Sequence, residues 1–369
     1  MKTFSNNDST QIEIGRHLNV TEQLLSQVAT HLSGTEQKAD IWTMPDLGLP
    51  HSVNRILGGF YTGALYTWTT AVPFVPVDAT VNTCGVAVFR TDHEVSTQEE
   101  FTALVARAKA VSEQTSYRWN YDNGNHFITL AENRTDGVIP RGRYIVLHSS
   151  ACEFKNGPQG LYPDPNAWFA HSIRTHVSPE HGRHLRYISG KTAEQFYRRA
   201  QMLEEFNRIR QEFFAETILG AHHCHEEVLN LPHYGMPSQN TVAIGCQWLN
   251  AGARCILLTA PNAPLYILRP SSLGNNRIEI SGTEKILQPH GLGLQHQGEL
   301  SLSYNESSID LNGQRFAAGT SLKTNPSISI RGTSGDGPAT IASQFLQHCP
   351  AQIDTTLYPL FTYPNPKRN

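Results

Sequence analysis

The 369-residue sequence predicts an α+β fold, with mixed sheets and one long central helix. Helix-like and strand-like segments follow one another in irregular order, whereas a parallel α/β fold would alternate them. One long helical pattern lies in the middle of the chain, and the strand-like segments are short. No internal repeat or linker-like stretch divides the sequence, so we expect a single domain over residues 1–369.

The first elements expected are a helix at 21–32, where Thr21 is a candidate N-cap, and a loop over the Gly- and Pro-rich residues 44–60. The longest helix is expected at 192–219, because apolar residues recur there every three to four positions. The Ser-, Gly- and Asn-rich residues 301–337 predict a variable extension. Runs of apolar and β-branched residues predict short strands at 83–90, 126–130, 143–148, 254–258, 264–268 and 277–281.

The bulk composition excludes several classes of protein. A net charge of −3 and a pI near 6.6 exclude a polybasic surface, although residues 134–210 carry 12 Lys/Arg against 7 Asp/Glu. That stretch is either a solvated charged face or a local contact for nucleic acid. No apolar run approaches the roughly 18 residues of a membrane span, and no signal peptide is visible. With six scattered cysteines, the sequence predicts a reduced, cytoplasmic protein without a membrane partner, and it leaves the oligomeric state open.

Three candidate metal ligands stand at the ends of predicted strands. Cys84 lies in a Thr-Cys-Gly turn, His126 follows Asn125 after a Gly-containing turn, and His148 ends the apolar run RYIVLH. Imidazole and thiolate are common ligands for transition metals, and binding sites are often assembled beside strand ends. The alternatives are a small core cysteine and partly buried histidines without a ligand.

Two further histidine motifs lie in the second half of the chain. The stretch His222–Glu227 (HHCHEE) directly follows the long helix, and at most two of its side chains can face one ion. Its last histidine, His225, is a candidate ligand. In PHGLG, His290 is a candidate nucleophile, and Gly291 and Gly293 would let the backbone approach a phosphate.

Taken together, these motifs resemble the RtcB family of RNA ligases, which join an RNA 3′-phosphate to a 5′-hydroxyl using GTP and manganese. The resemblance runs in the family's order from Met44-Pro45-Asp46 to Lys367 and so covers most of the chain. Its segments are TCGV (83–86), GNHF (124–127), LHSS (147–150), Asn207-Arg208 in the long helix, His225 to Gly235, and PHGLG (289–293).

The resemblance implies a role for each of these residues. Cys84 would bridge two manganese ions, with His148 and His225 on one and His126 on the other, and His290 would form a covalent guanylate. Paired ions stabilise attacking and leaving oxygens in phosphoryl transfer. RNA ends would be the partners and GTP the nucleotide. Contacts to the nucleotide are implied for Asn125, Thr129, Gly291, Gly293 and Lys367.

The sequence also departs from the family's pattern. Val81 stands where the family has a metal-binding Asp, and a carboxylate-free Cys/His set favours zinc or a single ion. Thr129 replaces the Glu that reads guanine. Cations that would face phosphates are replaced at Cys152, at Asn250–Ala253 and at Leu294. The pattern therefore fits a divergent ligase, a weakened RNA-end-binding protein of the same fold, or a mononuclear metal-dependent phosphoesterase.

Overall fold

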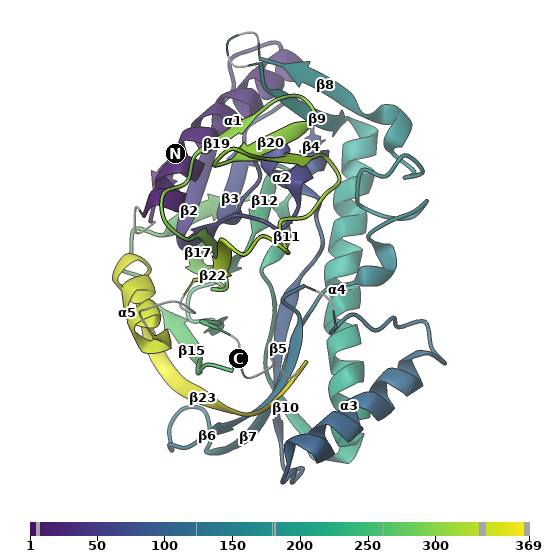
Figure 1. The fold of residues 1–369 in the computed structure, drawn as a ribbon, viewed down its shortest axis with the longest axis vertical. Helices are drawn as coiled ribbons and strands as arrows, with labels where there is room; N and C mark the ends of the chain where they lie inside the picture. Colours follow the sequence, from purple (N-terminus) through teal and green to yellow (C-terminus); the bar gives the residue numbers. More distant parts are fainter. Residues whose placement is uncertain are drawn as a thin grey trace.

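The computed structural model describes residues 1–4, 8–122, 124–178, 180, 182–260, 262–331 and 337–364. Helices and several sheets are mixed along the chain, so the predicted α+β class is confirmed. Figure 1 shows α4 (Lys191–Leu219) along one side of the molecule, from the level of β8 and β9 down to α3. The other helices are α1 (Ser9–Ser33), α2 (Val53–Gly58), α3 (Gln98–Ser112) and α5 (Pro338–His348), with short 3-10 turns η1 (Val77–Ala79), η2 (Cys152–Phe154), η3 (Ala170–Ser172) and η4 (Ala221–His223).

A five-stranded sheet lies next to α1 (Figure 1). Its order is β1-β2-β3-β12-β11, and it is mixed because β1 pairs with β2 in parallel while the other neighbours are antiparallel. Leu18 and Leu25 of α1 and Tyr66 of β3 belong to the hydrophobic cluster between helix and sheet. The strand bounds are β1 Lys2–Thr3, β2 Ala39–Gly48, β3 Thr62–Trp68, β12 Thr241–Ile244 and β11 Tyr234–Ser238.

A seven-stranded antiparallel sheet forms the other half of the molecule, in the order β10-β5-β7-β6-β23-β15-β14. The last strand in sequence, β23, lies in the interior of this sheet, between β6 and β15. Leu130, Ile145 and Phe214 belong to the cluster that packs α3 and α4 against one face. The strand bounds are β10 Cys224–Pro232, β5 Gly85–Thr91, β7 Gly142–Ser149, β6 Phe127–Asn133, β23 Ala351–Tyr363, β15 Leu265–Pro270 and β14 Cys255–Leu257.

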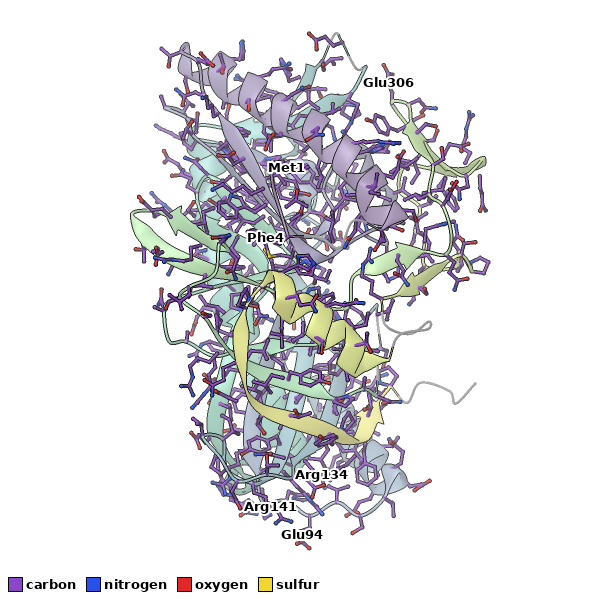
Figure 2. The ribbon with its side chains drawn as sticks, turned by 90° about the vertical axis from the view of Figure 1, so that its left-hand side faces the viewer. Met1, Phe4, Glu94, Arg134, Arg141 and Glu306 are labelled. Carbon is purple, nitrogen blue, oxygen red and sulfur yellow. The ribbon has the colours of Figure 1, made fainter. Side chains whose placement is uncertain are left out.

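Four smaller sheets complete the described structure. They are β13-β17-β16, β18-β22, β19-β20-β21 and β4-β9-β8. In Figure 2, Glu306 marks the β19–β20 turn near one end of the molecule, and Glu94, Arg134 and Arg141 mark the other end. Their bounds are β13 Cys246–Leu249, β17 Thr283–Pro289, β16 Arg277–Ile280, β18 Leu294–His296, β22 Ile328–Ile330, β19 Leu302–Tyr304, β20 Ser308–Leu311, β21 Gln314–Ala317, β4 Phe74–Pro76, β9 His184–Ser189 and β8 Arg174–Val177.

One segment differs from the sequence-based expectation, and the structure adds detail to a second. Residues 44–60, expected as a loop, contain the end of β2 and all of α2, because both are buried against the α1 cluster despite their Gly and Pro content. Residues 301–337 contain strands β19 to β22, and β22 pairs with β18. Within the described residues no helix is both long and apolar enough to cross a membrane.

The long helix α4 was predicted at nearly its observed bounds, but its buried face is partly polar. Met202 and Ile209, two of the recurring apolar residues of this helix, are 71% and 44% exposed. Arg210 and Gln211 are instead fully buried, beside the equally buried Phe214. Burial of an arginine costs free energy unless its hydrogen bonds are satisfied. This face of α4 therefore indicates polar partners packed against the helix.

Candidate functional site

Adjacent strands of the seven-stranded sheet bring three predicted ligands to one edge. Cys84 directly precedes β5, His126 directly precedes β6, and His148 lies near the end of β7, between its partners Val86 and Phe127. The Sγ atom of Cys84 is 3.3 Å from Nε2 of His148 and 3.5 Å from Nε2 of His126. The antiparallel register thus gathers residues 64 positions apart in sequence.

The fourth member of the cluster is His233, which the sequence-based ligand set did not include. Its Nε2 lies 3.2 Å from Nε2 of His148, and its backbone N–H donates to the carbonyl of Cys84 at 3.0 Å. Ligand atoms of Cys84, His148 and His233 all lie within 4.8 Å of one another, and all three side chains are buried. This group could hold a metal ion.

The prediction that His225 joins Cys84 and His148 is wrong. Strand β10 pairs with β5 so that Pro232 lies opposite Gly85 and Cys224 lies opposite Thr91. His233 therefore meets Cys84, while His225 lies at the far end of the strand, roughly 20 Å away at 3.3 Å per residue. There Nε2 of His225 contacts Asp92 at 2.8 Å, and His223 and His225 together lower the pKa of the Asp92 carboxyl to about 2.

The imidazoles of His126 and His148 are oriented by backbone carbonyls. Nδ1 of His126 lies 3.1 Å from the carbonyl oxygen of Asn120, and Nδ1 of His148 lies 2.9 Å from that of Asn125. A carbonyl can only accept, so each Nδ1 carries the proton and each Nε2 presents a lone pair toward Cys84. Metal-binding histidines are typically held in this way by their second nitrogen.

Burial keeps the cluster uncharged in the absence of an ion. It lowers the pKa of His148 to about 3, with the nearby His290 as a second cause, and holds the pKa values of His126 and His233 well below the ordinary value. Burial raises the pKa of Cys84 to about 12, opposed by the charges of Lys155 and Arg55. Neutral imidazoles are ready to bind metal, whereas the thiol must release its proton on binding.

His290 lies beside this cluster and is fixed in one orientation. Its Nδ1 is 2.9 Å from Oδ2 of Asp46 on β2 and 2.9 Å from the carbonyl oxygen of Gly245. Its ring stacks on His233, with centroids 4.5 Å apart and an interplanar angle of 21°. Because two acceptors face Nδ1, that nitrogen carries the proton and Nε2 is left as a nucleophile. Asp46 was not singled out for this role, since it lies in a stretch expected to be a loop.

The glycines of PHGLG pack closely against backbone, and their predicted contact with a phosphate stays a prediction. A Cβ on Gly291 would lie 1.5 Å from the carbonyl oxygen of Leu258, and one on Gly293 would lie 1.9 Å from that of Asp46. Both glycines are buried against backbone, and neither lines the adjoining cavity. They are therefore needed for close packing, which lets the N–H of Gly291 donate to Asp46 at 2.9 Å.

A cavity of about 790 Å³ adjoins the site, and Cys84, His126, His233 and His290 line it. Asn125 and Thr129, predicted to contact the nucleotide, line it as well. The Thr129 hydroxyl lies 3.1 Å from that of Thr362, so it already has a partner. Lys367, the last predicted contact, lies outside the described residues.

The cavity wall is cationic. Arg55, Lys155 and Lys323 line it, and Asp164 is the one carboxylate among its described lining residues. None of the three cations forms an ion pair within the described part of the chain, although Arg55 stacks on Tyr234. Lys323 belongs to the 301–337 segment, so the expected extension forms part of this wall.

Polar side chains on the buried face of α4 bind residues that lie next to the site. Arg210 donates to Oδ1 of Asn120 at 2.8 Å and to the Ser149 hydroxyl at 3.0 Å, and it pairs with Glu153 at 3.0 Å. The carbonyl oxygen of Asn120 in turn holds His126. About one turn earlier on the same helix, Asn207 donates to the carbonyl of Thr83, directly before Cys84, at 3.1 Å.

Two comparisons with known proteins gave no match: no family model fits the chain, and no curated protein is significantly similar to it. The likeness to RtcB ligases therefore stays a hypothesis based on motif order. Of the residues that sequence reasoning missed, His233 lies within the segment from His225 to Gly235, but nothing local distinguishes it from His225 as the ligand.

Proposed function

We propose that this chain is a divergent, metal-dependent RNA ligase of the RtcB type, joining RNA 3′-phosphate and 5′-hydroxyl ends through a nucleotidyl-histidine intermediate. The observation that carries the proposal is the setting of His290. Its Nδ1 is held by Asp46 and Gly245, and its ring stacks on a group of candidate metal ligands at the wall of a cationic cavity.

The proposed reaction begins at Nε2 of His290, which attacks the α-phosphorus of GTP. A P–N bond forms, the bond from the α-phosphorus to the bridging oxygen breaks, and pyrophosphate leaves. Asp46 stabilises the positive charge that develops on the imidazole, as the carboxylate of a catalytic triad does. An oxygen of the RNA 3′-phosphate then attacks the phosphorus on His290, the P–N bond breaks, and the GMP group is transferred to the RNA end. The 5′-hydroxyl oxygen of the second RNA next attacks the phosphorus of the 3′-phosphate and releases GMP.

The donor set fits a bound divalent cation. Cys84, His148 and His233, with His126 beside them, offer one thiol and three neutral imidazoles, and two of these imidazoles are oriented by carbonyls. When bound, manganese or zinc would supply Lewis-acid stabilisation of charge on phosphate oxygens. In this proposal a phosphate would lie between this group, Nε2 of His290 and the cationic wall.

The cations of the cavity wall support a phosphate-bearing substrate. Arg55, Lys155 and Lys323 supply cations to a chain that lacks those of the family at Cys152, at 250–253 and at Leu294, although they come from other segments. Each charge-assisted contact to a phosphate oxygen is worth about 1.5–3 kcal/mol. With Thr129 paired to Thr362 and no carboxylate there, the site lacks the group that would favour guanine over adenine.

A mononuclear phosphoesterase is the second candidate. It is favoured by one observation, the three-residue group Cys84, His148 and His233, since catalytic zinc sites commonly have three protein ligands. A hydrolase of this kind has no need of His290 as a nucleophile, so the two candidates differ in whether a covalent intermediate forms.

The test is covalent labelling of the full-length chain. Incubation with α-³²P-labelled GTP or ATP and Mn²⁺ or Zn²⁺, followed by a denaturing gel, is expected to give an acid-labile label. His290→Ala should abolish the label, and Asp46→Asn should reduce its rate of formation. His171→Ala changes an exposed histidine away from the cavity and should label as wild type does. If wild type takes no label with any of these nucleotides and metals, the ligase proposal is wrong.

A further inference from the structure

We infer that Cys84, His148 and His233 bind one zinc-class ion, in place of the two manganese ions that the family resemblance implies. The inference depends on the proposed function for the role of the ion in catalysis, but the existence of the site stands on the ligand geometry alone.

The chemistry of the donors argues against manganese. Mn²⁺ prefers carboxylate, carbonyl and water oxygens, whereas thiolate and imidazole select zinc and similar borderline-soft ions. No carboxylate oxygen within the described residues joins the group. At the position of the family's metal-binding Asp, Val81 is 2% exposed and packs into the hydrophobic cluster that also contains Cys84.

Two of the donor separations are close to the edges of a zinc tetrahedron, and the third, from Cys84 to His233, is within 4.8 Å. Zinc bonds of about 2.0–2.1 Å to nitrogen and 2.3 Å to sulfur put tetrahedral ligand atoms about 3.4 Å apart for two nitrogens and about 3.5 Å for nitrogen and sulfur. The observed separations are 3.2 Å from His148 to His233 and 3.3 Å from His148 to Cys84. Three protein ligands leave a fourth position, which is the arrangement of catalytic zinc sites.

A second ion beside His126 would be poorly bound. Nε2 of His126 contacts Sγ of Cys84 and the Ser150 hydroxyl, both at 3.5 Å, but it is not part of the mutually close group. Such an ion would have one imidazole, one shared thiolate and a neutral hydroxyl. We therefore assign no second ion to His126, whose Nε2 lone pair can instead accept from the Ser150 hydroxyl.

The first experiment is metal analysis of the full chain, expressed in medium containing both zinc and manganese and purified without chelator. We expect close to one zinc per chain and no stoichiometric manganese. Two manganese ions per chain, or no bound metal of either kind, would overturn the inference.

The second experiment identifies the ligands with Co²⁺ added to protein stripped of metal. Thiolate-to-cobalt charge-transfer absorption should appear in the near ultraviolet and should be missing in Cys84→Ser. His233→Ala and His225→Ala form a matched pair at opposite ends of β10. The first should weaken Co²⁺ binding by at least about 100-fold, more than the loss of an outer-shell partner costs, and the second should leave it within about twofold.

Absence of the charge-transfer band in wild type, or its loss in His225→Ala with retention in His233→Ala, would refute the assignment. The wild-type spectrum decides this even if a variant fails to fold. Covalent labelling of His290 is read separately, so a zinc site without label would sink the ligase proposal and leave this inference standing.

Discussion

Replacement of Arg210 by Met should destabilise the protein far more than a similar change two residues earlier on the same helix. The Arg210 side chain has no exposed area and pairs with Glu153, whose side chain is 5% exposed. It also donates to the carbonyl of Arg118 at 2.6 Å, to Asn120 and to Ser149. Removing one partner of a buried ion pair leaves an uncompensated charge and costs about 3–5 kcal/mol.

The assay is the free energy of unfolding in urea, with Arg208→Met as the control. Arg208 is 45% exposed and pairs with Glu205 and Glu227 at the surface, so its loss should cost about 1 kcal/mol or less. The double variant Arg210→Met/Glu153→Gln removes the orphaned charge and should recover about 2 kcal/mol or more of the loss.

If Arg210→Met lowers the free energy of unfolding no more than Arg208→Met does, the argument from the buried charge is wrong. Equal free energies of unfolding for Arg210→Met and Arg210→Met/Glu153→Gln would also refute it, because the unpaired charge of Glu153 would then cost nothing.

Three more predictions concern other parts of the molecule. Val81→Asp places a carboxylate in a 2% exposed position, so it should cost about 3–5 kcal/mol without metal and recover thermal stability on addition of Mn²⁺; unchanged stability without metal would contradict the burial argument. Burial, followed by the charge of Arg183, lowers the pKa of His17 to about 4, so the unfolded state binds a proton before the folded state does as pH falls. Stability should therefore drop by about 1.4 kcal/mol per pH unit between about pH 6.5 and 4, and His17→Gln should flatten the slope of unfolding free energy against pH. Lys323→Ala should raise the KM for nucleotide about tenfold, in line with one charge-assisted contact, without changing the melting temperature, whereas Lys191→Ala, far from the cavity lining, should change neither.

The strand ends that carry Cys84, His126 and His148 could be predicted from the sequence, because apolar runs stop at these residues and binding sites form beside such ends. The choice between His225 and His233 could not, since both flank the same strand and only its register against β5 decides which one meets Cys84. Local composition indicated a loop around Asp46. The burial of Asp46 against His290 depends on a contact between residues 244 positions apart, which no local pattern reveals.

The buried face of α4 was also beyond prediction from the sequence. Its period and length were evident, yet the apolar stripe did not identify the buried face, because Asn207, Arg210 and Gln211 find hydrogen-bond partners at the ends of β5 and β7. A buried polar side chain is stable only when distant backbone groups satisfy it. Such partners are properties of the assembled sheet and are invisible in a window of sequence.

The position of β23 has a consequence for the order in which the chain can fold during synthesis. Strand β23 follows every other strand that the structure describes, but it joins β6 to β15 within the seven-stranded sheet. Until residues 351–363 emerge from the ribosome, β6 and β15 both expose unpaired edges, which invite pairing with other chains. The nascent protein should therefore depend on chaperones late in translation. Truncated chains that end before β23 should aggregate, although they already contain Cys84, His148 and His233.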